Sequence, residues 1–121
     1  MARILIADDD PEYRDVFQDG LGAKGHRVTC VSSGADVMPL LRDETFDIVF
    51  LDVVMSGGGA ITVLHELREH DMELPTVIIT GRPALADSPL FMNGLRMAHA
   101  KLEKTASLTQ IDDVVRSLTT I

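Results

Sequence analysis

The 121-residue sequence has no tryptophan and a single cysteine, Cys30. One cysteine cannot form an internal disulfide, and without further thiolates there is no cysteine cluster to bind zinc. No stretch approaches the ~20 apolar residues of a membrane-spanning helix, and residues 1–4 lead directly into a strand pattern rather than a signal peptide. These absences favour a cytoplasmic protein that makes no membrane contact.

The sequence also lacks a run of basic residues. Its 11 Lys and Arg are outnumbered by 19 Asp and Glu, which gives a net charge of −8. A nucleic-acid backbone would be repelled unless the basic residues gathered on one face, and the few aromatic residues form no cluster for stacking on bases. We therefore expect no direct binding to nucleic acid.

The length suits one domain. The content of 45% hydrophobic and 25% charged residues is ordinary for a globular protein, and a chain of this size can bury a hydrophobic core. We find no internal repeat, low-complexity tract or linker, so residues 1–121 are expected to form a single domain.

Short apolar runs alternate with segments of helical periodicity. Strands are expected over residues 3–7, 26–31, 46–52, 75–80 and 98–103. Helices are expected over residues 11–24, 34–41, 59–70, 89–97 and 107–118. Five strands alternating with five helices predict an α/β fold in which helices cover both faces of a parallel sheet.

Several helices carry specific expectations. Asp10, Ser88 and Ser107 are expected to cap helices, Ser107 in a capping box with Gln110. Pro39 is expected to remove a hydrogen bond and kink its helix. Gly94 is expected to weaken its helix by about 1 kcal/mol relative to alanine, after a loop over residues 82–88.

Side-chain exposure can also be predicted. The helix over residues 59–70 is expected to bury Ile61, Leu64 and Leu67. Its polar side chains are expected in solvent: His65, Glu66, Arg68 and Glu69. In the following helix the expected apolar face consists of Leu90, Phe91, Leu95 and Met97. Met92 and its apolar neighbours are expected in the core, with a partner-binding patch as the alternative.

Polar residues follow four of the expected strands. Asp8 and Asp9 follow the first strand, Asp52 ends the third before the turn residues 56–59, Thr80 ends the fourth, and Lys104 follows the fifth. Parallel strands bring such residues to one edge of the sheet, where ligands bind. The sequence therefore predicts a site at this edge.

The chemistry of these residues is specific. Clustered carboxylates repel one another unless they hold a cation, and oxygen ligands alone favour Mg²⁺ or a similar hard ion such as Mn²⁺. A hydroxyl and an ammonium group suit phosphoryl oxygens, and an aspartate can attack phosphorus to give an acyl phosphate. The predicted site is a phosphoryl acceptor.

The chain resembles the receiver domain of two-component response regulators, the CheY-like family. The resemblance rests on residues 4–14, with their acidic turn, on residues 51–57 around Asp52, and on Thr80-Gly81. It implies a five-stranded flavodoxin-like fold. It also implies that a sensor histidine kinase or a histidine phosphotransfer protein phosphorylates Asp52.

The resemblance further implies site roles. Asp9, Asp52 and the Val54 carbonyl would hold Mg²⁺, with Asp8 reaching the ion mainly through water. Thr80, Gly81 and a lysine would contact the phosphoryl group. Their rearrangement would alter the face made by the fourth helix, fifth strand and fifth helix, which a downstream target or output domain would read.

Two lysines can fill the phosphoryl-binding role. Lys104, followed by Thr105, best matches the family pattern, and Lys101 is the alternative. Thr105 stands where the family has a proline preceded by a cis peptide, and a cis bond before threonine would cost ~3 kcal/mol. Lys101 stands where the family usually has a tyrosine or phenylalanine.

Two other functions are compatible with the residues. One is a degenerate receiver that is not phosphorylated and serves as a protein-interaction module. The other is an aspartyl-phosphate phosphatase, but Val54 stands where such enzymes have their second aspartate. We therefore expect slow loss of phosphate from Asp52 and no enzymatic turnover.

Overall fold

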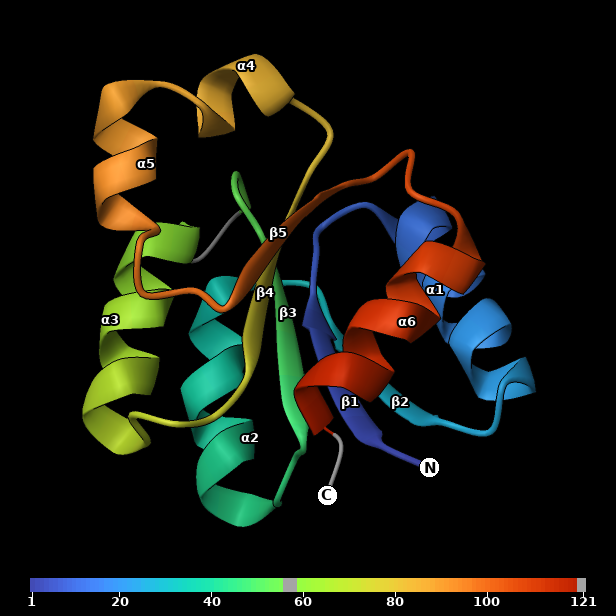
Figure 1. The fold of residues 1–121 in the computed structure, drawn as a ribbon. Helices are drawn as coiled ribbons and strands as arrows, with labels where there is room; N and C mark the ends of the chain where they lie inside the picture. The colour runs from blue at the N-terminus through green and yellow to red at the C-terminus, as the bar shows by residue number, and fades with distance from the viewer. Residues whose placement is uncertain (56–58, 120–121) are drawn as a thin grey trace.

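A computed structural model, described here for residues 1–55 and 59–119, contains a five-stranded, fully parallel sheet with helices on both faces (Figure 1). The strands lie in the order β2-β1-β3-β4-β5. Their bounds are β1 Arg3–Ala7, β2 Arg27–Val31, β3 Ile48–Asp52, β4 Thr76–Thr80 and β5 Ala100–Glu103. The predicted α/β fold with a five-stranded parallel sheet is confirmed.

The helices separate onto the two faces of the sheet. Their bounds are α1 Pro11–Ala23, the 3₁₀ turn η1 Gly34–Asp36, α2 Val37–Asp43, α3 Ala60–His70, α4 Pro83–Ala86, α5 Pro89–Gly94 and α6 Leu108–Thr119. α1 and α6 cover one face, and α2, α3 and α5 cover the other (Figure 1). Within the described residues, no helix is long and apolar enough to cross a membrane.

The central strands are buried because both faces are covered. Every residue of β3 and β4 is buried. Since successive side chains of a strand point to opposite faces, Val49 joins the core beneath α2 and α3, while Ile48 and Phe50 join the core beneath α1 and α6. The apolar runs of the sequence are therefore the centre of the sheet.

The predicted caps are present. The Asp10 carboxylate accepts hydrogen bonds from the amides of Glu12 (3.0 Å) and Tyr13 (3.4 Å), directly before α1. At α6, the Ser107 hydroxyl and the Gln110 side chain each accept a hydrogen bond from the other residue's amide. The capping box is thus confirmed.

The expected kink at Pro39 rested on a wrong helix start. A 3₁₀ turn occupies residues 34–36, and α2 begins only at Val37. Pro39 is therefore the third residue of α2, where a backbone N–H has no partner within the helix. Its missing N–H removes no helical hydrogen bond.

The segment after β4 also differs from expectation. Residues 82–88 are not a plain loop, because Pro83 begins the short helix α4. The Ser88 hydroxyl donates to the Leu85 carbonyl (2.8 Å) instead of capping α5. The described chain thus has six α-helices rather than five.

The apolar residues of α5 are only partly buried. Leu95, which directly follows α5, is buried, but Leu90 is 74% exposed and Met92 is 55% exposed, so Met92 does not lie in the core as expected. The predicted advantage of alanine at position 94 ignored packing, because a Cβ there would lie 2.6 Å from Cδ1 of Ile61. Gly94 lets α5 approach α3 closely.

The predicted turn at residues 56–59 lies outside the described residues except for Gly59.

Arg68 is the clearest error in predicted exposure. It was expected in solvent but is 4% exposed. Its guanidinium donates to the Met97, Asp71 and Leu74 carbonyls and to the Thr76 hydroxyl, at 2.8–3.1 Å. Arg68 therefore joins the end of α3 to the start of β4 and to the segment before β5.

Candidate functional site at the carboxyl end of the sheet

The polar residues that follow the strands meet at one edge of the sheet. Asp8 directly follows β1, Asp52 ends β3, Thr80 ends β4 and Lys104 follows β5. A cavity of about 400 Å³ lies there. Its lining residues are Asp9, Asp10, Asp52, Val54, Thr80, Gly81, Arg82 and Lys104. Every residue predicted for the site lines this cavity except Asp8, which is fully buried, and Lys101, the alternative lysine.

Three aspartates form an acidic cluster. Asp8, Asp9 and Asp52 each offer a carboxylate oxygen, and these oxygens all lie within 4.8 Å of one another. Asp8 and Asp52 are buried, whereas Asp9 is exposed. The Asp8 carboxylate is held in place because its Oδ1 accepts a hydrogen bond from the Asp10 amide (2.9 Å). The cluster is therefore built into the ends of β1 and β3.

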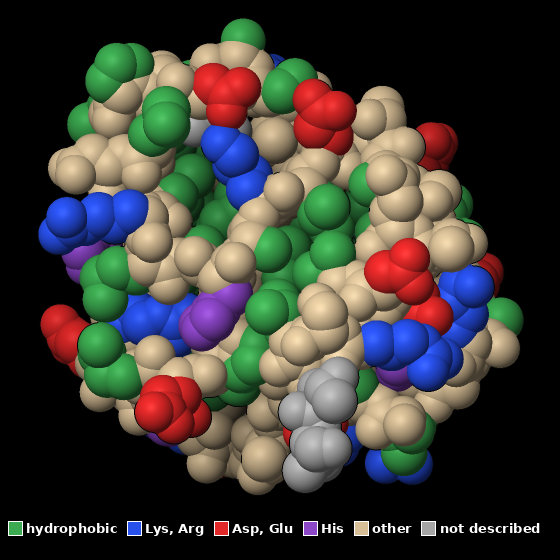
Figure 2. All heavy atoms as spheres, viewed as in Figure 1, with side chains coloured by type: hydrophobic (Ala, Val, Ile, Leu, Met, Phe, Trp, Pro, Cys, Tyr) green, Lys and Arg blue, Asp and Glu red, His purple; other side chains and the backbone are tan. Residues whose placement is uncertain are grey.

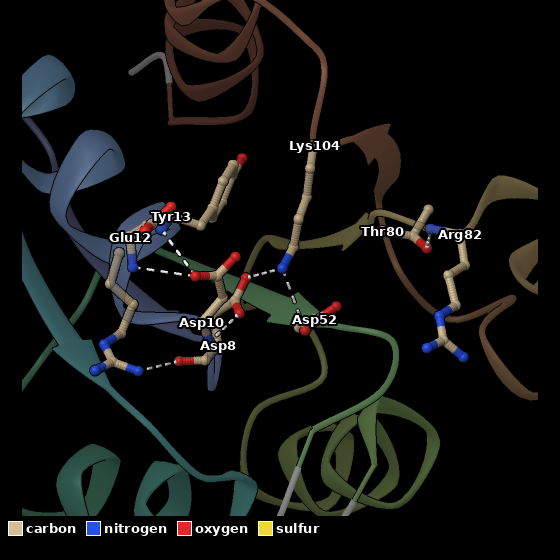
Figure 3. A network of polar contacts seen from close by, with 9 residues as sticks. Asp8, Asp10, Glu12, Tyr13, Asp52, Thr80, Arg82 and Lys104 are labelled. Carbon is tan, nitrogen blue, oxygen red and sulfur yellow. Dashed lines mark hydrogen bonds and ion pairs between the residues drawn. The ribbon is translucent and has the colours of Figure 1, made fainter.

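Lys104 reaches into this cluster. Its Nζ lies 2.7 Å from Oδ2 of Asp8 and 3.5 Å from Oδ2 of Asp52 (Figure 3). Its amide donates to the Thr80 carbonyl (2.8 Å), which extends the β4–β5 pairing to the site. Lys101 instead pairs with Asp87 (2.7 Å) at the surface. Of the two candidate lysines, the structure brings Lys104 to the aspartates.

The lysine reaches the site without the backbone geometry that the family resemblance suggested. The peptide bond between Lys104 and Thr105 is trans. The side chain passes close to Gly81, where a Cβ would lie 3.6 Å from Cδ of Lys104, an ordinary contact. The threonine that replaces proline therefore does not keep the lysine from the cluster.

Burial and like charge perturb the acids. Burial and the neighbouring Asp8 carboxylate raise the pKa of Asp52 to about 6, although Lys104 opposes the shift. Burial lowers the pKa of Lys104, but Asp8 and Asp52 outweigh it, so the net direction is upward. Lys104 therefore stays charged at neutral pH. Asp52 changes from its protonated to its ionised form near pH 6.

The site suits a divalent cation. Among the described residues, Lys104 is the one basic side chain in an ion pair with the cluster, so one ammonium faces three carboxylates. Oδ2 of Asp8 is fully buried, and within the same part of the chain its only polar contact is this ion pair. Oxygen ligands of this kind match Mg²⁺ or Mn²⁺. The donor set therefore fits the predicted metal.

Thr80 and Arg82 lie on the other side of Asp52. The Thr80 hydroxyl accepts a hydrogen bond from the Arg82 amide (2.8 Å; Figure 3). A hydroxyl that accepts a hydrogen bond still has its own proton to donate. Arg82, an exposed cation that lines the cavity, was missed by sequence reasoning.

Two further residues at the site were also missed. Arg14 donates from its guanidinium to the Asp8 carbonyl (2.7 Å), and the Tyr13 ring lies beneath the Lys104 ammonium. Both follow the acidic turn within one helical turn, and that spacing is the only signal the sequence offered.

A parallel sheet in this strand order, with three aspartates and a lysine at its carboxyl edge, is the arrangement of a two-component signalling domain. Residues 4–116 match the family model described as the response regulator receiver domain, and the chain belongs to that family. The resemblance inferred from the sequence is thereby confirmed.

Curated relatives include transcriptional regulators. The chain is 32% identical over 117 residues to the transcriptional regulatory protein TctD of Salmonella typhimurium, covering 96% of this chain and 51% of TctD. It is 34% identical over 89 residues to the response regulator receiver protein CpdR of Brucella abortus, covering 74% of each. The chain therefore spans about half the length of TctD.

A solved structure shares the fold. The response regulator TrrA from Thermotoga maritima, in complex with Mg²⁺-BeF, superposes with a TM-score of 0.87. The match covers 98% of this chain and 99% of TrrA, at 23% sequence identity. At this identity the likeness supports the receiver fold.

Proposed function

We propose that this receiver domain accepts a phosphoryl group on Asp52 from a sensor histidine kinase or a histidine phosphotransfer protein, with Mg²⁺ or Mn²⁺ present. One observation carries the proposal: the Asp52 carboxylate lies within 4.8 Å of those of Asp8 and Asp9, and 3.5 Å from the Lys104 ammonium, at a solvent-open cavity. A nucleophile, a metal platform and a donor for phosphoryl oxygens are thus together.

Each residue has a defined task in this proposal. An Asp52 oxygen attacks phosphorus as the bond to the donor breaks, which leaves an acyl phosphate on Asp52. Thr80 and Lys104 donate hydrogen bonds to phosphoryl oxygens, beside the Gly81 backbone. Asp9, Asp52 and the Val54 carbonyl would hold the metal, and Asp8 would reach it mainly through water. The bound ion supplies positive charge where the transferred oxygens are negative.

The phosphorylated domain would signal through another surface. Figure 2 shows hydrophobic side chains gathered along β5, between α5 and α6. Helices α5 and α6 correspond to the fourth and fifth helices of the expected fold. A cavity of about 230 Å³ between α5 and β5 is lined in part by Met92, Leu95 and Ala100. We assign this face to a downstream target or output domain, in keeping with the transcriptional role in TctD's name. No enzymatic turnover is expected.

The direct test is covalent phosphorylation. The protein is incubated with Mg²⁺ and a small phosphodonor, and its intact mass is measured. We expect one added phosphate that is lost slowly, that requires the metal, and that is absent in Asp52→Ala. Phosphate on a histidine or serine, or in the Asp52→Ala variant, would overturn the assignment.

A degenerate, non-phosphorylated receiver is the second candidate. It is favoured by the pairing of Lys101 with Asp87, where the family usually has an aromatic residue, and by Thr105. This candidate predicts no added phosphate with any small donor. The same mass measurement therefore separates the two.

Metal affinity is expected to depend on pH. Because the pKa of Asp52 is about 6 in the metal-free protein, a proton competes with Mg²⁺ for this ligand below that pH. Affinity should fall by up to about tenfold per pH unit below pH 6 and level off above pH 7. Calorimetric titration with Mg²⁺ from pH 5 to 8 measures this, and a flat profile would show that Asp52 is not a ligand.

A further inference from the structure

We propose that Tyr13 is a positioning residue, whose aromatic ring holds the Lys104 ammonium beside Asp52 during phosphoryl transfer. The inference rests on the proposed function of Asp52. Nζ of Lys104 lies over the Tyr13 ring, 4.9 Å from its centroid. This distance is within the ~6 Å range of cation–π attraction.

The ring is itself held firmly. Tyr13 lies in the first turn of α1, where its amide donates to the capping carboxylate of Asp10 (3.4 Å). Its ring packs against Phe17, with centroids 6.1 Å apart, and Phe17 packs edge-on against Phe50 of β3 at 5.0 Å. Because Phe17 and Phe50 are buried in the core, the ring is a fixed platform.

The ammonium needs such a platform. A lysine side chain has four rotatable bonds, and the groups that hold it here are the carboxylates of Asp8 and Asp52. These carboxylates are also the proposed partners of the metal and the phosphoryl group, so they are shared when the site is in use. The ring binds neither, so its attraction for Lys104 remains.

The ring, rather than the hydroxyl, makes this contact. The Tyr13 hydroxyl points away from Asp8 and Asp52 (Figure 3), and it is buried without a hydrogen-bond partner among the described residues. Burial, with Asp8 and Asp52, raises the pKa of Tyr13 to about 12, so the ring is neutral at physiological pH. Phenylalanine should therefore replace it and leucine should not.

The kinetic test compares Tyr13→Leu with Tyr13→Phe, using Mg²⁺ and a small phosphodonor. We expect the leucine variant to be phosphorylated about 2-fold to 30-fold more slowly, and the phenylalanine variant to keep the wild-type rate. In a Lys104→Met background, Tyr13→Leu should have no further effect. An equal loss in Tyr13→Phe, or a full loss that persists without Lys104, would overturn the proposal.

A second measurement needs no activity. In the metal-free protein, NMR should show the Lys104 side-chain methylene protons shifted upfield by the ring, in wild type and Tyr13→Phe but not in Tyr13→Leu. Tyr13→Met takes the place of leucine if that variant unfolds. A shift seen without phosphorylation of the wild type would refute the function assigned to Asp52 and leave the contact standing. A lost shift with an unchanged rate would refute the positioning role.

Discussion

Asp52→Asn is expected to abolish phosphorylation and, in metal-free protein at pH 7, to raise the free energy of unfolding by ~1–3 kcal/mol. Asp52 is buried next to Asp8, and its pKa in the folded protein is about 6, above the ordinary value of 3.8. A raised carboxyl pKa means that the folded state binds the proton more tightly than the unfolded state. The ionised carboxylate therefore destabilises the fold at pH 7, and the neutral amide removes that penalty.

The pH dependence gives this prediction a sharp signature. The advantage of Asp52→Asn should be largest above pH 6, shrink as the pH falls from 6 toward 3.8, and vanish below about pH 3, where the wild-type carboxyl is protonated in both states. Urea unfolding at several pH values, with chelator present, measures it. Asp19→Asn, an exposed change on α1, is the matched control. A variant no more stable than wild type at pH 7 would contradict the assigned electrostatics.

Most of the fold followed from patterns that the sequence states directly. Buried runs such as Ile48–Leu51 fixed the central strands, and the ends of parallel strands brought Asp8, Asp52 and Thr80 to one edge. That these side chains meet was predictable because they are tied to strand ends, whose positions the hydrophobic pattern sets.

Which of the two lysines reaches the aspartates depends on the register of β5 in the sheet, and the sequence does not state that register. Lys101 and Lys104 are three positions apart, so a strand would direct them to opposite faces. Which face meets the aspartates follows from the register of β5 against β4, in which Thr80 pairs with Glu103. That register comes from packing in the whole sheet.

No repeating pattern in the sequence indicated that Arg82 and Tyr13 face the site, or that the short helix α4 forms. Side-chain direction in a loop or at a helix start depends on local backbone angles rather than on a repeating pattern. The four residues of α4 are also too few for helical periodicity. Only the folded structure shows which of these side chains turn toward the cavity.

Arg68 was predicted to lie in solvent because arginine is charged, although its spacing along α3 indicates a buried position. It follows Leu64 by four positions, which places it on the same side of α3 as a buried leucine. A guanidinium tolerates burial when its donors are satisfied. Four backbone or side-chain oxygens satisfy them here, which no local pattern could reveal.

Replacing Arg68 by methionine is accordingly expected to lower the free energy of unfolding by about 3–5 kcal/mol. Methionine fills much of the same space but donates no hydrogen bonds. It would leave the Met97 carbonyl and the hydroxyl of fully buried Thr76 without the donor that Arg68 supplies, and the Leu74 carbonyl would keep only its hydrogen bond from Thr76. Unfolding in urea measures the loss.

Two comparison variants make the result interpretable. Arg42→Met changes an exposed arginine of α2 and should shift stability by no more than about 0.5 kcal/mol. Arg68→Lys keeps the charge but has one ammonium in place of a planar fork, so it should fall between wild type and Arg68→Met. If Arg68→Met were as mild as Arg42→Met, the buried hydrogen bonds would not stabilise this corner. Arg68 binds the start of β4, at the end of the sheet opposite the site, and Thr80 ends the same strand at the site. A large loss would show that this strand depends on one arginine.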